Sequence, residues 1–321
     1  MSLYNISPRS LASKINSSDR IAFLTSHRLG DTLLGMIVVN NLRREGLTVE
    51  VFSQAVFELK EWFPEVAVFP FSEFKNRAST YQHIWFERPN RWIKKAPCSQ
   101  AKSNVVLKES PLYRLALPMC TILQLICQYE LGISHPVLEN GLVIPESAQV
   151  IKDPKKIIIH PTSSSWIKNW KIKGFIQVGR LLQDQGFNPE FIVDSQDIKV
   201  ALQLRQAGMI CFTHSDLVAV ARHLGTGSCF IGNDSGLGQL ASNVGTPTIT
   251  LFTLPRRAMR WQPCWAPAIA VLPALSEKIP ELLQHIIWKR WITPEEVFDA
   301  FQNFRKTVQE GRKGLGISDG S

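Results

Sequence analysis

Short apolar runs alternate with longer segments of helical spacing over most of the chain. Near-continuous apolar runs between helices are typical of parallel strands that are covered on both faces. We therefore predict an α/β fold, with strands over 20–25, 48–52, 83–86, 156–160, 190–193, 209–212, 229–231 and 248–252. Helices are predicted between them, over 32–45, 57–62, 112–129, 174–185, 198–207 and 216–224.

A polar, Pro-containing passage over 144–154 interrupts this alternation, and the pattern restarts after it, as expected of a linker. The sequence therefore predicts two doubly wound α/β domains, 1–150 and 151–293. Ligands are expected at the carboxyl ends of the strands and in the cleft between the domains. A last helix, 294–309, is expected to pack back on the N-terminal domain, and 310–321 to form a flexible tail.

The composition is that of a globular protein, with 45% hydrophobic and 20% charged residues among 321. Most of the net charge of +9 falls in 75–114, where nine Lys and Arg residues occur with two Glu. Two interpretations of this basic segment stay open: an ordinary solvated face, or a docking surface for nucleic acid, acidic lipid headgroups or a phosphorylated glycan. The segment also contains Trp85, Phe86 and Trp92. Contact of these aromatic side chains with a membrane surface is a hypothesis.

The sequence favours a cytoplasmic location. Residues 1–20 are too polar for a signal peptide, and the apolar stretch 112–133 is interrupted too often to span a bilayer. The six cysteines show no metal-binding spacing and are expected to be free thiols in a reducing compartment.

Three strand-to-helix junctions carry candidate chemistry. In the first, 26–31, Gly30 permits a tight turn and Asp31 precedes a helix. Asp is a preferred N-cap residue, which accounts for its position without any chemistry. The alternative is a carboxylate that takes a proton from an incoming hydroxyl. The sequence leaves both interpretations open.

The second junction, 160–170, places three serines and a threonine after a buried strand, with Lys168 close behind. Hydroxyls, backbone N–H groups and an ammonium suit a phosphate, although the spacing is not that of a P-loop. A plain polar loop with a solvated lysine is the competing interpretation. His160, at the strand end, is expected to be a satisfied core histidine.

The third junction is GNDSGLGQLASNVGTP, residues 232–247. Either Asp234 or Ser235 can cap the helix that follows, while Gly236 and Gly238 keep side chains away from its N-terminus. An anion there would meet free N–H groups and the positive end of the helix dipole. A bare capping role competes, but four glycines are more than a cap requires.

Other enzyme classes are disfavoured. No GxGxxG fingerprint follows the first strand, as a nicotinamide or flavin enzyme would need, and neither a serine-hydrolase elbow nor a paired-histidine metal motif occurs.

Together the three junctions resemble the bacterial heptosyltransferase family, glycosyltransferase family 9. Its C-terminal signature resembles 233–241, with Asp-Ser-Gly, followed by Gly-Thr-Pro at 245–247 and a strand ending at Phe252. Its middle motif resembles 161–170, and its N-terminal motif resembles Leu-Gly-Asp-Thr-Leu at 29–33. The resemblance covers most of the chain.

The resemblance implies the GT-B fold, with two Rossmann-like domains facing a cleft. The N-terminal domain would bind the acceptor and the C-terminal domain the nucleotide sugar. The implied activity is inverting, metal-independent transfer of heptose or a related sugar from ADP-heptose to the lipopolysaccharide inner core, with no cofactor. Contact with the inner membrane surface would be peripheral.

The resemblance also implies roles for individual residues, with Asp31 as the general base. Residues implied to hold the donor diphosphate are Lys168, Thr162, Ser163, Ser235 and Gly236. Those implied to contact the donor sugar or ribose are Asp234, Gln239 and Asp197, with Asp194 as a second choice for the ribose. The loop at His214-Ser215 would lie near adenine. The anionic acceptor would meet Arg88, Arg91, Lys94 and Lys95 of the basic segment.

The sequence departs from the family at Gln239, where the family has histidine; an amide forms hydrogen bonds but carries neither proton nor charge. Thr253 stands where a glycine is usual, and the proline common in the first helix is absent. Gln239 supports an alternative, a catalytically inactive nucleotide-sugar-binding protein of the same fold, whereas the retained Asp31, Lys168 and Asp234 argue against it. A nucleic-acid-binding protein is a third hypothesis, but no motif supports it and no nucleic-acid partner is expected.

Overall fold

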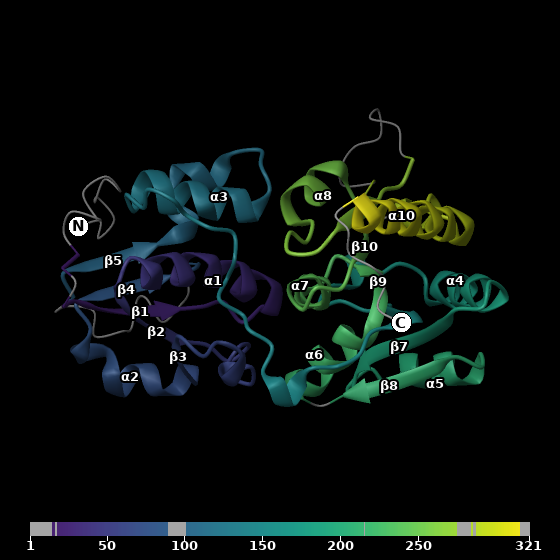
Figure 1. Cartoon of the computed structure of the whole chain (residues 1–321), viewed down its shortest axis with the longest axis horizontal. Coiled ribbons are helices and arrows are strands. Elements are labelled where there is room, and N and C mark those ends of the chain that lie inside the picture. Colours follow the sequence, from purple (N-terminus) through teal and green to yellow (C-terminus); the bar gives the residue numbers. More distant parts are fainter. Residues whose placement is uncertain are drawn as a thin grey trace. The chain divides into compact units, whose positions relative to one another are not determined.

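The computed structural model describes residues 15–16, 18–88, 101–214, 216–274, 284 and 287–314. The chain divides into two compact units, Met1–Ala148 and Gln149–Ser321, so the division falls two residues before the predicted boundary. Each unit is built around one parallel sheet flanked by helices (Figure 1).

The sheet of the first unit has the order β3-β2-β1-β4-β5 among the described residues, and every pair is parallel. Its strands are β1 (Arg20–Leu24), β2 (Thr48–Phe52), β3 (Ala67–Phe69), β4 (His83–Phe86) and β5 (Ser103–Val106). The sequence predicted β1, β2 and β4. It missed the two edge strands because β3 has three residues and β5 begins with the polar Ser103 and Asn104.

The helices of the first unit are α1 (Leu29–Arg44), α2 (Phe74–Arg77) and α3 (Met119–Leu125). The single helix predicted over 112–129 is wrong. A 3-10 turn covers Pro111–Arg114, α3 starts after Pro118, and a π-helical turn, Ile126–Glu130, follows. A proline disfavours helical backbone in the residue before it, so no helix continues through this point. Of the helix predicted over 57–62, only the 3-10 turn Lys60–Trp62 forms.

The sheet of the second unit has the order β11-β10-β9-β6-β7-β8, again parallel throughout. Its strands are β6 (Asp153–His160), β7 (Asn188–Asp194), β8 (Ile210–His214), β9 (Gly227–Asn233), β10 (Thr248–Leu251) and β11 (Ala268–Val271). Its helices are α4 (Ile172–Asp184), α5 (Ile198–Gln206), α6 (Leu217–Thr226), α7 (Gly236–Asn243), α8 (Pro255–Trp261) and α10 (Pro294–Gly314). The chain adds β7 and β8 on one side of β6 and then returns to add β9 on the other side, which makes the β6–β9 boundary a topological switch point.

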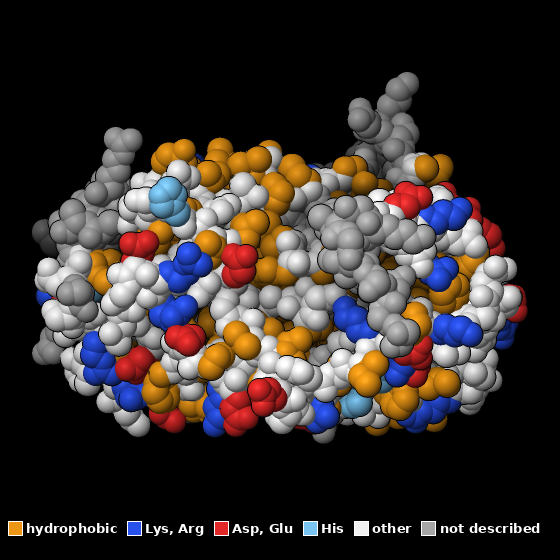
Figure 2. Space-filling view, in the orientation of Figure 1, with side chains coloured by type: hydrophobic (Ala, Val, Ile, Leu, Met, Phe, Trp, Pro, Cys, Tyr) orange, Lys and Arg blue, Asp and Glu red, His pale blue; other side chains and the backbone are white. Residues whose placement is uncertain are grey.

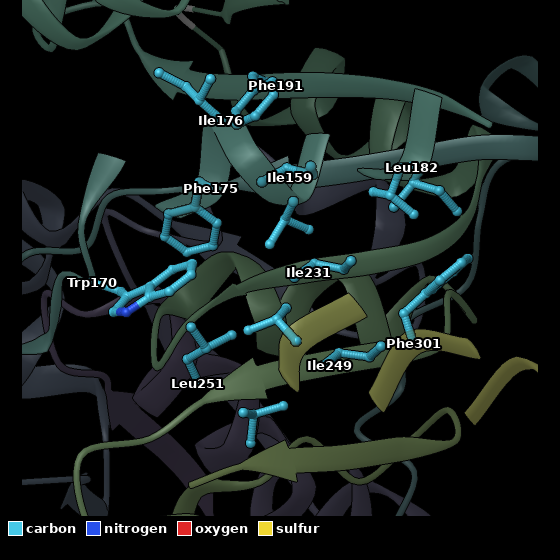
Figure 3. Packing of buried hydrophobic residues seen from close by; sticks show 14 of the residues in the cluster. Ile159, Trp170, Phe175, Ile176, Leu182, Phe191, Ile231, Ile249, Leu251 and Phe301 are labelled. Carbon is cyan, nitrogen blue, oxygen red and sulfur yellow. The ribbon is translucent and has the colours of Figure 1, made fainter. Parts of the chain in front are cut away.

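The C-terminal helix α10 belongs to the core of the second unit. Its buried face, Val297, Phe301 and Phe304, joins a cluster with Ile249 and Trp170 from the sheet side, and α10 lies against α4 and β11 (Figures 1 and 3). The buried face of this helix is thus covered within the second unit, and packing of the helix on the N-terminal domain stays a prediction. Burial of each such side chain contributes about 1.5–3 kcal/mol. The helix extends to Gly314, into the predicted tail, and 315–321 lie outside the described residues.

The basic segment is not a continuous cationic surface in its described part. Arg77 lies 3.5 Å from Glu50, and Lys102 lies 2.7 Å from Asp19, so both are used in ion pairs. Trp85 and Phe86 are fully buried, which contradicts their suggested contact with a membrane; Trp92 lies outside the described residues. On the face drawn in Figure 2, Lys and Arg side chains are interspersed with Asp and Glu. No helix in the described ranges is long and apolar enough to cross a membrane.

Candidate functional site

The candidate site of the second unit lies at the switch point between β6 and β9. Their parallel register pairs His160 with Gly232, so the loops that follow, 161–170 and 234–236, leave the sheet at the same level. Ligands of open α/β sheets bind outside the carboxyl ends of the strands at such a point. Both loops carry residues that the sequence predicted to bind the donor.

Asp234 is held by two cations in this site. Its Oδ2 lies 3.0 Å from Lys168 Nζ, and 3.1 and 2.5 Å from Nε and Nη2 of Arg257. Two positive groups around one carboxylate leave a surplus positive charge. A ligand with several negative oxygens, such as a diphosphate, suits that surplus.

Arg257 comes from α8 and was missed by the sequence reasoning. A usable signal was present, because three arginines occur in Pro255–Trp261, directly after the last predicted strand of the second half. That strand end lies beside β9, whose end carries Asp234, since Leu251 pairs with Asn233. Knowing that β10 neighbours β9 would have placed Arg257 near Asp234.

Asn233, which is fully buried, fixes the loop that carries Lys168. Its Oδ1 accepts a hydrogen bond from the N–H of Trp170 at 3.0 Å, and its Nδ2 donates to the C=O of Pro161 at 2.7 Å. The Trp170 indole packs edge-on against Phe175 in the core (Figure 3), with the ring centres 5.1 Å apart. One side chain at the end of β9 therefore holds both ends of the 161–170 loop.

Helix α7 begins beside this cluster without a side-chain cap. Ser235 occupies the N-cap position, but its hydroxyl does not cap the helix, and its buried Oγ has no hydrogen-bond partner among the described residues. Asp234, the other predicted cap, lies one residue before it. An uncapped N-terminus presents the positive end of the helix dipole to a ligand, which favours an anion.

The glycines of 232–247 have different structural roles. A Cβ on Gly232 would lie 2.9 Å from the Phe230 ring and 3.0 Å from the His160 carbonyl, so this glycine is required by packing within the sheet. Gly245 has φ +80°, a conformation that favours glycine, and it ends the turn after α7. Only Gly236 and Gly238 remain for the predicted task of opening the helix N-terminus.

Gln239 is buried on α7, and its amide orientation follows from its partner. A backbone carbonyl only accepts hydrogen bonds, so the group 2.7 Å from the Trp261 carbonyl is the amide nitrogen. The other amide atom, Oε1, is buried and has no hydrogen-bond partner in the part of the chain that the structure describes. Gln239 therefore connects α7 to the end of α8 and offers an acceptor oxygen.

The remaining donor-site predictions are placed as follows. Thr162 is buried, whereas the Ser163 hydroxyl donates within its own loop, with its Oγ 2.7 Å from Asn169 Oδ1 and 3.0 Å from the Ser165 carbonyl. Asp197 precedes α5 without capping it, and Asp194 Oδ1 accepts from the Gln196 N–H. Asp194 is the last residue of β7 and Asp197 follows it, and β7 is the neighbour of the switch-point strand β6.

The histidines near these strands are engaged within the protein. His160 Nδ1 is 2.8 Å from the Ile192 carbonyl, and burial lowers the pKa of His160, as expected of a core histidine. His214, at the end of β8, lies 3.0 Å from His223, which in turn lies 2.7 Å from Glu190. Ser215 lies outside the described residues.

In the first unit, Asp31 is the third residue of α1, and Arg28 is the N-cap residue. The interpretation of Asp31 as an N-cap is therefore wrong. Asp31 Oδ1 lies 2.9 Å from Nη2 of Arg88, one of the predicted acceptor residues. The other three, Arg91, Lys94 and Lys95, lie outside the described residues.

Glu87 is a buried carboxylate beside this pair that the sequence reasoning did not select. Its Oε1 lies 3.6 Å from Arg88 Nε, and its Oε2 accepts from the Ser26 N–H at 2.9 Å. Burial, together with the nearby Asp31 charge, raises the pKa of Glu87 to about 7. The available signal was an acid placed directly after the fully apolar end of β4.

Comparison with known proteins relates this site to one family. Residues 128–284 match the model of glycosyltransferase family 9 (heptosyltransferase). No curated protein sequence matches the chain.

Solved structures resemble the chain at low sequence identity. A glycosyltransferase family 9 protein from Veillonella parvula superposes with a TM-score of 0.72 at 17% identity, covering 91% of this chain and 98% of that one. The structure of the E. coli ADP-heptose lps heptosyltransferase II gives a TM-score of 0.66 at 16% identity, covering 90% of this chain and 99% of that one. The structure of the E. coli heptosyltransferase WaaC with ADP gives a TM-score of 0.65 at 14% identity, covering 89% of this chain and 99% of that one. These similarities confirm the predicted fold class, a GT-B-like pair of parallel-sheet α/β domains.

Proposed function

We propose that this chain is a glycosyltransferase of the heptosyltransferase family, and that it transfers heptose, or a related sugar, from ADP-heptose to a hydroxyl of the lipopolysaccharide inner core. The transfer inverts the anomeric carbon and needs neither a metal ion nor another cofactor. The main support for donor binding is the position of Asp234 between Lys168 and Arg257. The choice of nucleotide is supported by similar proteins whose structures are described with ADP or ADP-D-beta-D-heptose.

In the proposed reaction, the acceptor oxygen bonds to the anomeric carbon while the bond from that carbon to the β-phosphate oxygen breaks. The electron pair stays on the leaving ADP, and the acceptor proton goes to Asp31. Lys168, Arg257 and the N-terminus of α7 at Gly236 offset the charge that the leaving group gains. Removal of one such contact typically lowers the rate on the order of 10²–10³.

The other donor contacts follow from which atoms have partners. Two buried acceptors, Ser235 Oγ and Gln239 Oε1, find no hydrogen-bond partner within the described ranges, and they suit sugar hydroxyls. Asp234 contacts the sugar while keeping the two cations in place. The Ser163 hydroxyl is engaged in its own loop, so Thr162 and backbone N–H groups contact the phosphates, and Asp197 binds the ribose.

On the acceptor side, Asp31 is the base, and the cations of the basic segment attract the anionic core. Arg88, Arg91, Lys94 and Lys95 are the proposed contacts, with Arg88 already paired to Asp31. The protein would act in the cytoplasm, at the cytoplasmic face of the inner membrane, because the acceptor is anchored there.

A second candidate, a nucleotide-sugar-binding protein without turnover, is favoured by one observation. Gln239, at the position of the family histidine, has its nitrogen engaged with the Trp261 carbonyl and cannot deliver a proton. The retained Asp31, Lys168 and Asp234 favour the enzyme.

Calorimetry with ADP-, UDP- and GDP-sugars tests the donor site. ADP-heptose should bind to the wild type, and Lys168→Ala should bind it at least tenfold more weakly, because a charge-assisted contact contributes about 1.5–3 kcal/mol. Lys173→Ala, an exposed lysine on α4, is the matched control and should bind like the wild type. No binding of any nucleotide sugar, or equal binding by Lys168→Ala, would reject the proposal. Transfer to a lipopolysaccharide core acceptor then separates an enzyme from a binding protein.

A further inference from the structure

Glu87 occupies a position where a carboxylate is costly. The residue is 2% exposed at the end of β4, and its Oε2 accepts a hydrogen bond from the Ser26 N–H in the turn between β1 and α1. It lies under α1, because a Cβ on Gly35, one turn after Asp31, would be 3.5 Å from Glu87 Cγ. A glutamine would make the same hydrogen bond without a buried charge, so the bond to Ser26 does not explain why an acid stands here.

Arg88 links Glu87 to Asp31. The Arg88 guanidinium has Nη2 2.9 Å from Asp31 Oδ1 and Nε 3.6 Å from Glu87 Oε1. One cation is thus shared by two carboxylates that repel each other. In such a cluster the proton affinity of each acid depends on the charge of the other.

We propose that Glu87 is a positioning residue for the base, which holds Arg88 against Asp31 and sets how strongly Asp31 binds a proton. The proposal rests on the role of Asp31 in the proposed function. When Glu87 is protonated, it no longer competes with Asp31 for the charge of Arg88, and Asp31 becomes a weaker base. When Glu87 is ionised, Arg88 is shared and Asp31 becomes a stronger base.

The groups that face Glu87 cause its carboxyl group to ionise near neutral pH. Burial is the largest cause of its raised pKa, the Asp31 charge on α1 adds to it, and the Ser26 N–H and Arg88 oppose it. The resulting pKa of about 7 means that a small change in pH alters the strength of the base.

The first experiment measures transfer by wild type and Glu87→Gln between pH 6 and 8.5 under donor and acceptor saturation. The two proteins should be similar at pH 6. At pH 8, Glu87→Gln should be roughly three- to tenfold slower, because proton-transfer rates follow base strength. Glu50→Gln is the matched control, since Glu50 is a part-buried acid on β2 that pairs with Arg20 and Arg77 instead. An unchanged profile in Glu87→Gln would overturn the proposal.

The second experiment needs no activity. The carbon-13 side-chain signal of Glu87, assigned by its loss in Glu87→Gln, is titrated in wild type and in Asp31→Asn. Removing the Asp31 charge should lower the Glu87 midpoint by about one pH unit. An unmoved midpoint would overturn the coupling. If the midpoint moves but the wild type transfers no sugar, the coupling stands and the proposed function fails.

Discussion

The carboxyl edges of the two sheets hold opposite arrangements of charge. In the first unit, one cation, Arg88, lies between two carboxylates, Asp31 and Glu87. In the second unit, one carboxylate, Asp234, lies between two cations, Lys168 and Arg257. Among the described residues, the same parallel-sheet architecture therefore carries a cluster of net negative charge at this edge in the first unit and one of net positive charge in the second.

This difference separates two chemical tasks. A negative surplus raises the affinity of an acid for protons, which is what a base requires. A positive surplus attracts a diphosphate and stabilises it as it leaves. Substitutions in the two clusters should therefore affect different measurements.

The largest effect is expected from Asp31→Asn. Loss of the base should slow transfer by about 10²–10⁴, the usual contribution of a positioned general base. Affinity for ADP-heptose should stay within about twofold in calorimetry, because the donor cations are untouched. Full transfer by Asp31→Asn would remove Asp31 as the base, and a large loss of donor affinity would undo the division of tasks.

Arg257→Ala should weaken donor affinity, which Asp31→Asn leaves intact. Without the second cation, ADP binding should weaken roughly ten- to a hundredfold, since hydrogen bonds to charged groups contribute about 1.5–3 kcal/mol. Arg180→Ala, which removes an exposed arginine on α4, is the control for the loss of one positive charge. Equal ADP affinity in the two variants would show that Arg257 holds Asp234 only.

Glu87 also predicts how stability depends on pH. Its raised pKa means that the folded protein binds this proton more tightly than the unfolded chain does. The stabilisation is therefore present below the ordinary glutamate pKa and is lost as pH rises through about 7. Between pH 5 and pH 8, wild type should lose about 2–3 kcal/mol relative to Glu87→Gln, by denaturant titration. A constant difference between the two proteins would mean that Glu87 ionises normally.

Gln239→His should have the smallest effect. A ring N–H can replace the amide as donor to the Trp261 carbonyl, so the link between α7 and α8 is kept. Protonation of the new imidazole adds a positive charge near the donor site. ADP affinity should therefore rise as pH falls from 8 to 6, by no more than about threefold, given an ordinary histidine pKa near 6.5. A large loss of binding at both pH values would instead show that the Gln239 acceptor oxygen is needed.

The sequence predicted the parts of the site that lie at strand ends. Lys168 and Asp234 each follow a buried apolar strand, and the parallel register then brings their loops to one level. Arg257 and Glu87 were missed because their roles depend on which strands are neighbours, β10 beside β9 and β4 beside β1. That order is a tertiary property which no local pattern records.

The packing partner of α10 could not be predicted from the sequence for the same reason. The stripe formed by Val297, Phe301 and Phe304 predicts a helix with one buried face, but it does not say which surface covers that face. The structure places the stripe in the core of the second unit, against α4.

Asn233 sets a condition for exchanging parts between related enzymes. Because its side chain binds Trp170 and Pro161 at once, the strand end and the lysine loop have to be inherited together. A chimaera that keeps 161–170 but takes position 233 from a relative without asparagine would leave two buried backbone groups of the loop unpaired.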